Sequence, residues 1–209
     1  EFLRFRLRQG VYGQRQPDSQ MIRVKIPFGG LTADQMDILG EAAAKYAPLK
    51  KGHITTRENV QYHHVPLGET TDLLRMLGDA GLSTREACGN TVRNVVAAPS
   101  AGVSKDEAFD VTPYAAAYAR YFLRHPTTQN MPRKSKTAFS GSEKDEAMVL
   151  MHDVGMVARV QNGRRGFKIV LGGGLSTSPM MAQTLREFVP VEDFIKHCEA
   201  ALRVFNRQD

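Results

Sequence analysis

The order of alternating and helical patterns in the first eighty residues constrains the fold most. Residues 2–8 (FLRFRLR) and 21–27 (MIRVKIP) alternate apolar and basic side chains, which is typical of half-buried strands. Between them, residues 10–20 are rich in Gly, Pro, Asp and Ser and predict a loop. In the second strand Arg23 and Lys25 stand two apart, so they are expected to share one face.

A helix is predicted over residues 31–47, where Thr32 and Gln35 have the spacing of a capping box. Residues 53–65 read as extended, and a second helix over residues 70–81 ends at a glycine. The order β, β, α, β, α over residues 1–80 predicts a compact α+β unit. We place a domain boundary there, with a second α+β domain over residues 81–209.

The second part begins with residues 83–102, which show little periodicity and predict a long functional loop. The remaining patterns predict a helix, a strand entered from the PRKSK stretch, two strands joined by an Asn162-Gly163 turn, and an amphipathic terminal helix. In order, these elements cover residues 113–125, 137–141, 146–160, 167–174 and 191–208.

Composition excludes several classes of protein. The only two cysteines, Cys88 and Cys198, make neither a disulfide framework nor a paired-cysteine metal motif, so we expect a reducing cytoplasm. No apolar run approaches the length of a membrane span. The formal charge of +6 favours an anionic partner, without choosing between nucleic acid, phosphate and carboxylates.

Six basic residues occur in extended or loop contexts and carry the functional hypothesis. Singly, each is typical of a solvated surface charge. Together they lie among small polar residues or in same-face pairs, which favours anion binding. Two ammonium groups on one strand face repel each other unless an anion lies between them. The six are Arg23, Lys25, Arg57, Arg93, Lys134 and Lys136.

Two other motifs are weak. Residues 165–170 (RGFKIV) partly match an RNA-binding pattern but lack its stacking aromatics, so we interpret them as a hairpin strand. Residues 172–177 (GGGLST) lack the third glycine of a dinucleotide-binding loop. Neither nucleic acid nor a membrane is expected as a partner.

Five motifs in order resemble the N-terminal half of the sirohaem and iron–sulfur sulfite and nitrite reductases. They are MIRVKIPFGG, ITTRENVQYHH, GNTVRNV, MPRKSKTAF and LGGGLS. The resemblance runs nearly end to end. It implies a ferredoxin-like half-domain followed by an α+β sirohaem-binding domain, in an oxidoreductase.

The resemblance also implies roles for nine residues. Those implied to bind the substrate anion, and so to be catalytic, are Arg23, Arg93, Lys134 and Lys136. Those implied to bind sirohaem are Thr55, Arg57, Gln61, His63 and Asn94. At position 53, where some relatives carry another arginine toward the cofactor, this chain has a histidine.

The family's [4Fe–4S] cluster needs four cysteines, which the resemblance places in the C-terminal half. Two cysteines cannot supply four thiolates, so we expect the cluster ligands outside this segment, in cis or in trans, and an inactive segment on its own. In this family the second lysine is typical of sulfite reductases, so the resemblance implies that Lys136 favours six-electron reduction of sulfite to sulfide. Nitrite reduction to ammonia and a non-catalytic basic binding module are the alternatives. The expected electron donor is a ferredoxin or a flavoprotein.

Overall fold

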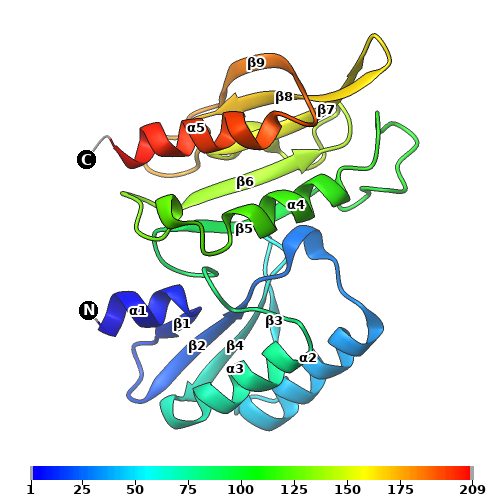
Figure 1. Cartoon of the computed structure of the whole chain (residues 1–209). Coiled ribbons are helices and arrows are strands. Elements are labelled where there is room, and N and C mark those ends of the chain that lie inside the picture. Colours follow the sequence, from blue (N-terminus) through cyan, green and yellow to red (C-terminus); the bar gives the residue numbers. More distant parts are fainter. Residues whose placement is uncertain (1, 208–209) are drawn as a thin grey trace.

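The computed structural model describes residues 2–207 and contains two lobes, each built on its own sheet (Figure 1). Glu1, Gln208 and Asp209 lie outside the described part, and so does the predicted end of the terminal helix at residue 208. Within residues 2–207 no helix is long and apolar enough to span a membrane. The lobes contact each other where loops that connect the strands of the first sheet approach the first strand of the second sheet. The domain boundary after residue 80 stays a prediction.

The first sheet is antiparallel, in the order β1-β2-β4-β3. Two helices pack against each other and cover one of its faces (Figure 1). The core between them includes Ile22, Tyr62 and Leu73, all fully buried. The elements of this lobe are β1 (Val11–Gly13), β2 (Ser19–Val24), η1 (Pro27–Gly29), α2 (Ala33–Tyr46), β3 (His53–Ile54), β4 (Val60–Pro66), η2 (Leu67–Glu69) and α3 (Thr70–Asp79).

The strand predicted over residues 2–8 is wrong, because this segment is a helix, α1 (Phe2–Arg8). Both edges of β2 are taken by β1 and β4, so no central position in the sheet remains for it. Gly10, at φ 80°, turns the chain directly into β1, and a Cβ there would lie 2.2 Å from the Thr84 carbonyl oxygen. Leu and Arg are good helix formers, and none of the helix's residues is buried.

Local sequence signals fix the start of α2 and the end of α3 as predicted. The capping box at Thr32 is complete, since Gln35 N donates to Thr32 Oγ1 at 3.2 Å and Thr32 N to Gln35 Oε1 at 3.1 Å. After α3, Gly81 adopts φ 75° and Leu82 N donates to Leu77 O at 2.9 Å. This Schellman closure ends the helix and directs the chain toward the second lobe.

The second sheet has the order β5-β6-β7-β8-β9, with parallel pairing among its first three strands and antiparallel pairing among its last three. The predicted Asn162-Gly163 turn is confirmed, with φ 51° and 75° between β7 and β8. The elements are β5 (Val92–Ala97), α4 (Thr112–Phe122), η3 (Pro126–Thr128), β6 (Ser135–Ser140), η4 (Val149–Met151), β7 (Val154–Gln161), β8 (Arg164–Leu171), β9 (Gln183–Pro190) and α5 (Phe194–Asn206).

Helices α4 and α5 cover one face of the second sheet (Figure 1). Their core is aromatic, with Phe167 within 5.6 Å, centroid to centroid, of Phe109, Phe139 and Phe194. Helices and sheets therefore mix as the α+β class predicts. Three strands escaped the sequence patterns: β1 and β5, which lie inside the two predicted loops, and β9, most of whose side chains are exposed.

Candidate functional site: a basic cleft between the two sheets

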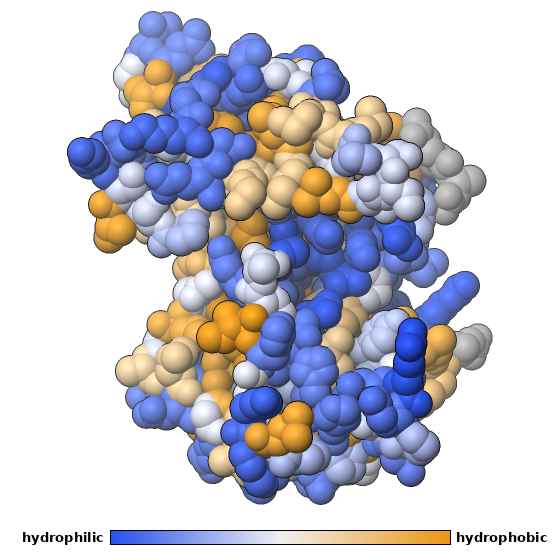
Figure 2. All heavy atoms as spheres, turned by 180° about the vertical axis from the view of Figure 1, so that it is seen from behind, coloured by the Kyte–Doolittle hydropathy of each residue, from blue (hydrophilic) through white to orange (hydrophobic). Residues whose placement is uncertain are grey.

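Eight of the nine residues with predicted roles line one cleft of about 230 Å³ between the sheets. Seen from behind, hydrophilic residues gather at the junction of the two lobes (Figure 2). No lining residue carries a carboxylate, among the residues that the structure describes. The lining is Arg23, Thr55, Thr56, Arg57, Asn59, Gln61, Ala87, Arg93, Asn94, Lys134 and Lys136.

Arg23 lies on β2, opposite Gln61 of β4 in the register of the first sheet. With the Gln61 amide turned so that both partners are satisfied, Arg23 donates to its oxygen from Nη2 at 2.9 Å and from Nε at 3.0 Å. The amide nitrogen then donates to His63 Nε2 at 3.2 Å. His63, the ninth predicted residue, is therefore connected to the cleft through Gln61 without lining it.

Arg93 of β5 is held by the loop that precedes its own strand. Its Nε donates to Gly89 O and its Nη1 to Ala87 O, both at 2.9 Å. Arg23 Nη1 donates to the same Ala87 oxygen at 3.2 Å, so one carbonyl orients an arginine from each sheet. Burial, followed by the nearby charges of Arg23 and Arg133, lowers the Arg93 pKa.

Lys134 and Lys136 flank Ser135 at the start of β6, and both side chains are half-buried. Burial lowers the pKa of both lysines. Neighbouring cations lower it further, with Arg93 the first of them for Lys134 and Arg57 for Lys136. Asp153 fixes this strand end from β7's side, because its Oδ2 accepts from the Lys136 backbone N–H at 2.7 Å.

A tight turn between β3 and β4 presents Arg57 to the second lobe. Thr55 Oγ1 accepts from the backbone N–H groups of Arg57, at 3.3 Å, and of Asn59, at 3.1 Å. Thr55 N donates to Asn59 O at 2.9 Å and closes the turn. The hydroxyl of Thr55 therefore shapes the loop as well as lining the cleft.

Arg57 reaches beneath the second sheet and is held there by three acceptors. Its Nη2 donates to Asn94 O at 2.5 Å and to Thr137 O at 3.2 Å, and its Nη1 to His152 Nε2 at 2.5 Å. Burial lowers the Arg57 pKa to about 10 and the His152 pKa to about 4. His152 is therefore neutral, and its Nδ1–H donates to Met148 O at 2.8 Å.

Sequence reasoning missed His152. A single histidine before a buried strand carries no ligand spacing, and its partner Arg57 lies 95 residues earlier. We name the pair Arg57 and His152 the inter-lobe clamp. Because His152 engages Nη1 and two backbone carbonyls engage Nη2, only the buried Nε of Arg57 has no partner among the described residues. The predicted sirohaem contact of Arg57 stays a prediction.

Asn94, on β5 of the second lobe, adds hydrogen bonds to the contact between the lobes. Its Nδ2 donates to Arg57 O at 2.9 Å and to Ile26 O at 2.7 Å, so it ties β5 to the first lobe. Its Oδ1 is buried without a partner among residues 2–207. Lys25, expected to share a face with Arg23, does not line the cleft; its Nζ donates to Val92 O at 3.1 Å.

The cleft therefore concentrates five cationic side chains, with hydroxyl and amide groups between them. Such an arrangement is costly when empty and favourable when anions occupy it, because bound negative charge removes the mutual repulsion. Its chemistry suits a small oxyanion, a group bearing several carboxylates, or both.

Comparison with known families places the chain in a class. The sequence family described as "Nitrite/Sulfite reductase ferredoxin-like half domain" matches residues 12–80, and "Nitrite and sulphite reductase 4Fe-4S domain" matches residues 88–209. The chain therefore belongs to the nitrite and sulfite reductase family. The family and the fold class predicted from its motifs are confirmed.

Individual relatives agree. The chain is 35% identical over 187 residues to "Sulfite reductase [ferredoxin] 1" of Mycolicibacterium paratuberculosis, covering 88% of this chain and 33% of that protein. It is 30% identical over 190 residues to "Ferredoxin--nitrite reductase" of Leptolyngbya laminosa, covering 88% and 37%. The solved structure of the Mycobacterium tuberculosis NirA protein superposes with a TM-score of 0.88 at 33% identity, covering 98% of this chain and 40% of that one. The chain thus spans about a third of the length of these curated relatives.

The described residues hold no cluster of three or more His, Cys, Asp or Glu side chains that could bind a metal ion. Cys88 and Cys198 are both buried, Cys88 in the loop that precedes β5 and Cys198 on α5, within the core of the second lobe. Burial raises the pKa of both thiols. The family description names a [4Fe–4S] cluster, as the resemblance implied, and its ligands stay predicted outside this segment.

Proposed function

We propose that this chain is the N-terminal half of a sirohaem-dependent sulfite reductase, and that the basic cleft holds the substrate anion. The observation that carries the proposal is the convergence of Arg23, Arg93, Lys134 and Lys136, from both sheets, on a lining without carboxylates. Nitrite reductase is the alternative, because relatives of both names match the chain.

The donor set of the cleft also fits part of a sirohaem, whose edge carries carboxylates. Cations, hydroxyls and amides surround the hollow, and the buried donor Arg57 Nε has no partner among the described residues. At about 230 Å³ the hollow is smaller than a typical ligand pocket, so it suits one anionic edge and a small anion. Thr55, Gln61 and Asn94 would contact that edge, with Arg57 and His63 behind them. When bound, sirohaem and the cluster would carry the electrons that the reaction needs.

The chain's own residues would position the anion and deliver protons. Arg23 and Arg93, fixed by one carbonyl, offer directional donors to an oxyanion. Lys134 and Lys136 hold protons on Nζ with lowered pKa, which eases donation as oxygen leaves as water. Sulfite carries up to two negative charges and nitrite one, so a second lysine adds more for sulfite. A ferredoxin or a flavoprotein would supply the electrons from outside.

The test is the double substitution Lys134→Ala with Lys136→Ala in the complete enzyme. We expect sulfite turnover to fall by about 10²–10⁴-fold, the usual contribution of positioned proton donors, while sirohaem absorbance stays unchanged. Lys105→Ala, an exposed lysine outside the cleft, is the matched control and should leave turnover intact. Unchanged turnover in the double variant would remove the lysines from the mechanism.

A single substitution separates the two substrates. Lys136→Asn should weaken sulfite reduction much more than nitrite reduction, because it removes one positive charge and keeps a hydrogen-bond donor. Equal loss for both anions would contradict the assignment of Lys136 to sulfite preference. Steady-state kcat/KM values for both anions, measured on the same preparation, give the comparison.

A further inference from the structure

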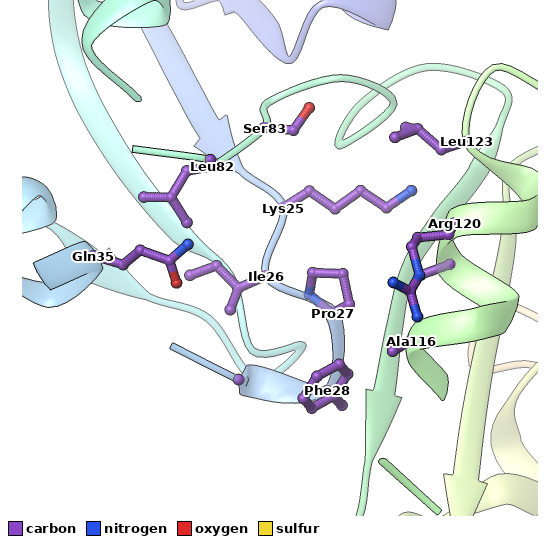
Figure 3. A pocket seen from close by; sticks show the side chains of 13 residues that line it. Lys25, Ile26, Pro27, Phe28, Gln35, Leu82, Ser83, Ala116, Arg120 and Leu123 are labelled. Atoms are coloured by element: carbon purple, nitrogen blue, oxygen red, sulfur yellow. The ribbon is translucent and has the colours of Figure 1, made fainter. Parts of the chain in front are cut away.

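A second hollow, of about 500 Å³, shares no lining residue with the basic cleft. It lies between the end of β2, the η1 turn, the segment from Gly81 to Ser83, and α4 (Figure 3). Its walls are mainly apolar, and its volume lies within the range of small-molecule sites. The apolar residues that matter here are Ile26, Pro27, Phe28, Leu82 and Leu123.

Lys25 brings a buried positive charge into this apolar hollow. The residue is 6% exposed, and its side chain extends from the end of β2 toward α4 (Figure 3). Its Nζ has one hydrogen-bond partner among the described residues, Val92 O at 3.1 Å, and no carboxylate within ion-pair distance. An ammonium has three N–H donors, and buried lysines are normally paired. Two donors of Lys25 are therefore unmatched.

The charge state of Lys25 depends on its surroundings. Burial lowers its pKa to about 8, with Glu86 opposing the shift and Arg93 adding to it. At pH 7 most of the protein therefore carries an ammonium in this hollow. An anion placed beside it would remove the cost of burying an unpaired charge.

Arg120 supplies a second cation from the exposed face of α4. It projects toward the same space (Figure 3), and the described residues give it neither a hydrogen bond nor an ion pair. The polar lining residues Gln35 and Ser83 are neutral, and no lining residue is acidic. Two cations thus border an apolar hollow that contains no countercharge.

We propose that this hollow binds an organic carboxylate with an apolar body, its carboxylate paired with Lys25 and Arg120 and its body against the apolar walls. The charge complementarity selects an anion, and the walls select an apolar body over a bare inorganic ion. The inference does not depend on the proposed reductase function, because the two sites have different linings.

Calorimetric titration of the 209-residue chain at pH 7 tests the proposal with three probes. We expect 3-phenylpropanoate to bind. Both 3-phenylpropan-1-ol and propanoate should bind at least about tenfold more weakly, because the alcohol lacks the carboxylate and propanoate lacks the phenyl group. Equal binding of the alcohol would overturn the role of the cations. Equal binding of propanoate would overturn the role of the walls.

Variants locate the site. Arg120→Met changes an exposed helix position and should weaken 3-phenylpropanoate about tenfold, whereas Arg75→Met, an exposed arginine on α3, should not. Lys25→Met should abolish binding. If that variant does not fold, the pH profile replaces it, since affinity should fall as the pH rises through about 8 while the probe stays ionised.

The double change Lys134→Ala with Lys136→Ala should leave affinity for the probe unchanged. Loss of binding in this double variant would place the probe in the basic cleft and overturn the proposal. Full affinity in Arg120→Met, or an affinity that does not change between pH 7 and pH 10, would overturn it as well.

Discussion

Replacing His152 with leucine should loosen the inter-lobe clamp and lower the free energy of unfolding. The substitution removes the acceptor that lies 2.5 Å from Arg57 Nη1. A hydrogen bond to a charged group contributes about 1.5–3 kcal/mol, and the guanidinium N–H left behind is buried and unpaired. We therefore expect a loss of about 2–4 kcal/mol, measured by urea unfolding at pH 7.

The pH dependence gives this prediction its sign. The folded-state pKa of His152 is about 4, below the usual 6.5, because burial and then Arg57 disfavour the imidazolium. At pH values between about 4 and 6.5, His152 is protonated in the unfolded chain and neutral in the folded chain. Stability from His152 is thus complete above pH 6.5 and is lost as the pH falls toward 4, by about 3 kcal/mol in total.

The readout is therefore the difference between the wild type and His152→Leu across pH 4 to 7. Glu58 and Asp153, whose pKa values are raised mainly by burial, titrate in both proteins and cancel in that difference. We expect the advantage of the wild type to shrink toward pH 4. His152→Gln, which can still accept from Arg57, should restore part of the stability. A difference below about 0.5 kcal/mol at pH 7, or one independent of pH, would refute the reasoning.

Three further changes in stability should be measurable by urea unfolding. Thr32→Ala removes the cap of α2 and should cost about 1 kcal/mol, while Thr32→Asp should cost little; equal losses would contradict the cap. Gly155→Ala should cost about 1–3 kcal/mol, because its Cβ would lie 2.8 Å from both Val149 Cβ and Val149 O, and a neutral result would show that η4 can move away. Phe167→Ala, at the centre of the aromatic core, should cost about 3–5 kcal/mol, and a loss below about 1 kcal/mol would contradict its central place.

Signals that act within a few residues were readable from the sequence. The capping box at Thr32, the glycine end of α3 and the Asn162-Gly163 turn each depend on neighbours in the chain, so the local sequence specifies them. Residues 2–8 show the limit of such reasoning. Their alternation fits a strand, but the edges of β2 are already occupied, and that is a property of the whole sheet.

Strand β5 was missed because a strand that is buried on both faces does not need to alternate apolar and polar side chains. Most of its side chains are buried, and Arg93, with Asn94, interrupts the apolar run in order to reach the junction between lobes. Strand β9 was missed for the opposite reason, since its exposed side chains give no apolar pattern.

The cleft itself followed from the motifs of a known family, because isolated basic residues do not show which of them converge. The separation of Lys25 from Arg23 illustrates this point. Two residues apart on one chain segment, they line different cavities, because Lys25 follows the end of β2, where the backbone pairs with Ser83. His152 had no sequence signal, since its partner comes from the other lobe.

The span of the inter-lobe clamp sets an order of events during biosynthesis. Arg57 and His152 are 95 residues apart, an interval that a ribosome translates in roughly 5–20 s. The first sheet and its two helices have their own core and can form before His152 exists. Throughout that interval Arg57 is a solvated cation on a nascent chain. Any prosthetic group that requires the assembled junction can therefore be captured only after the second sheet has been translated.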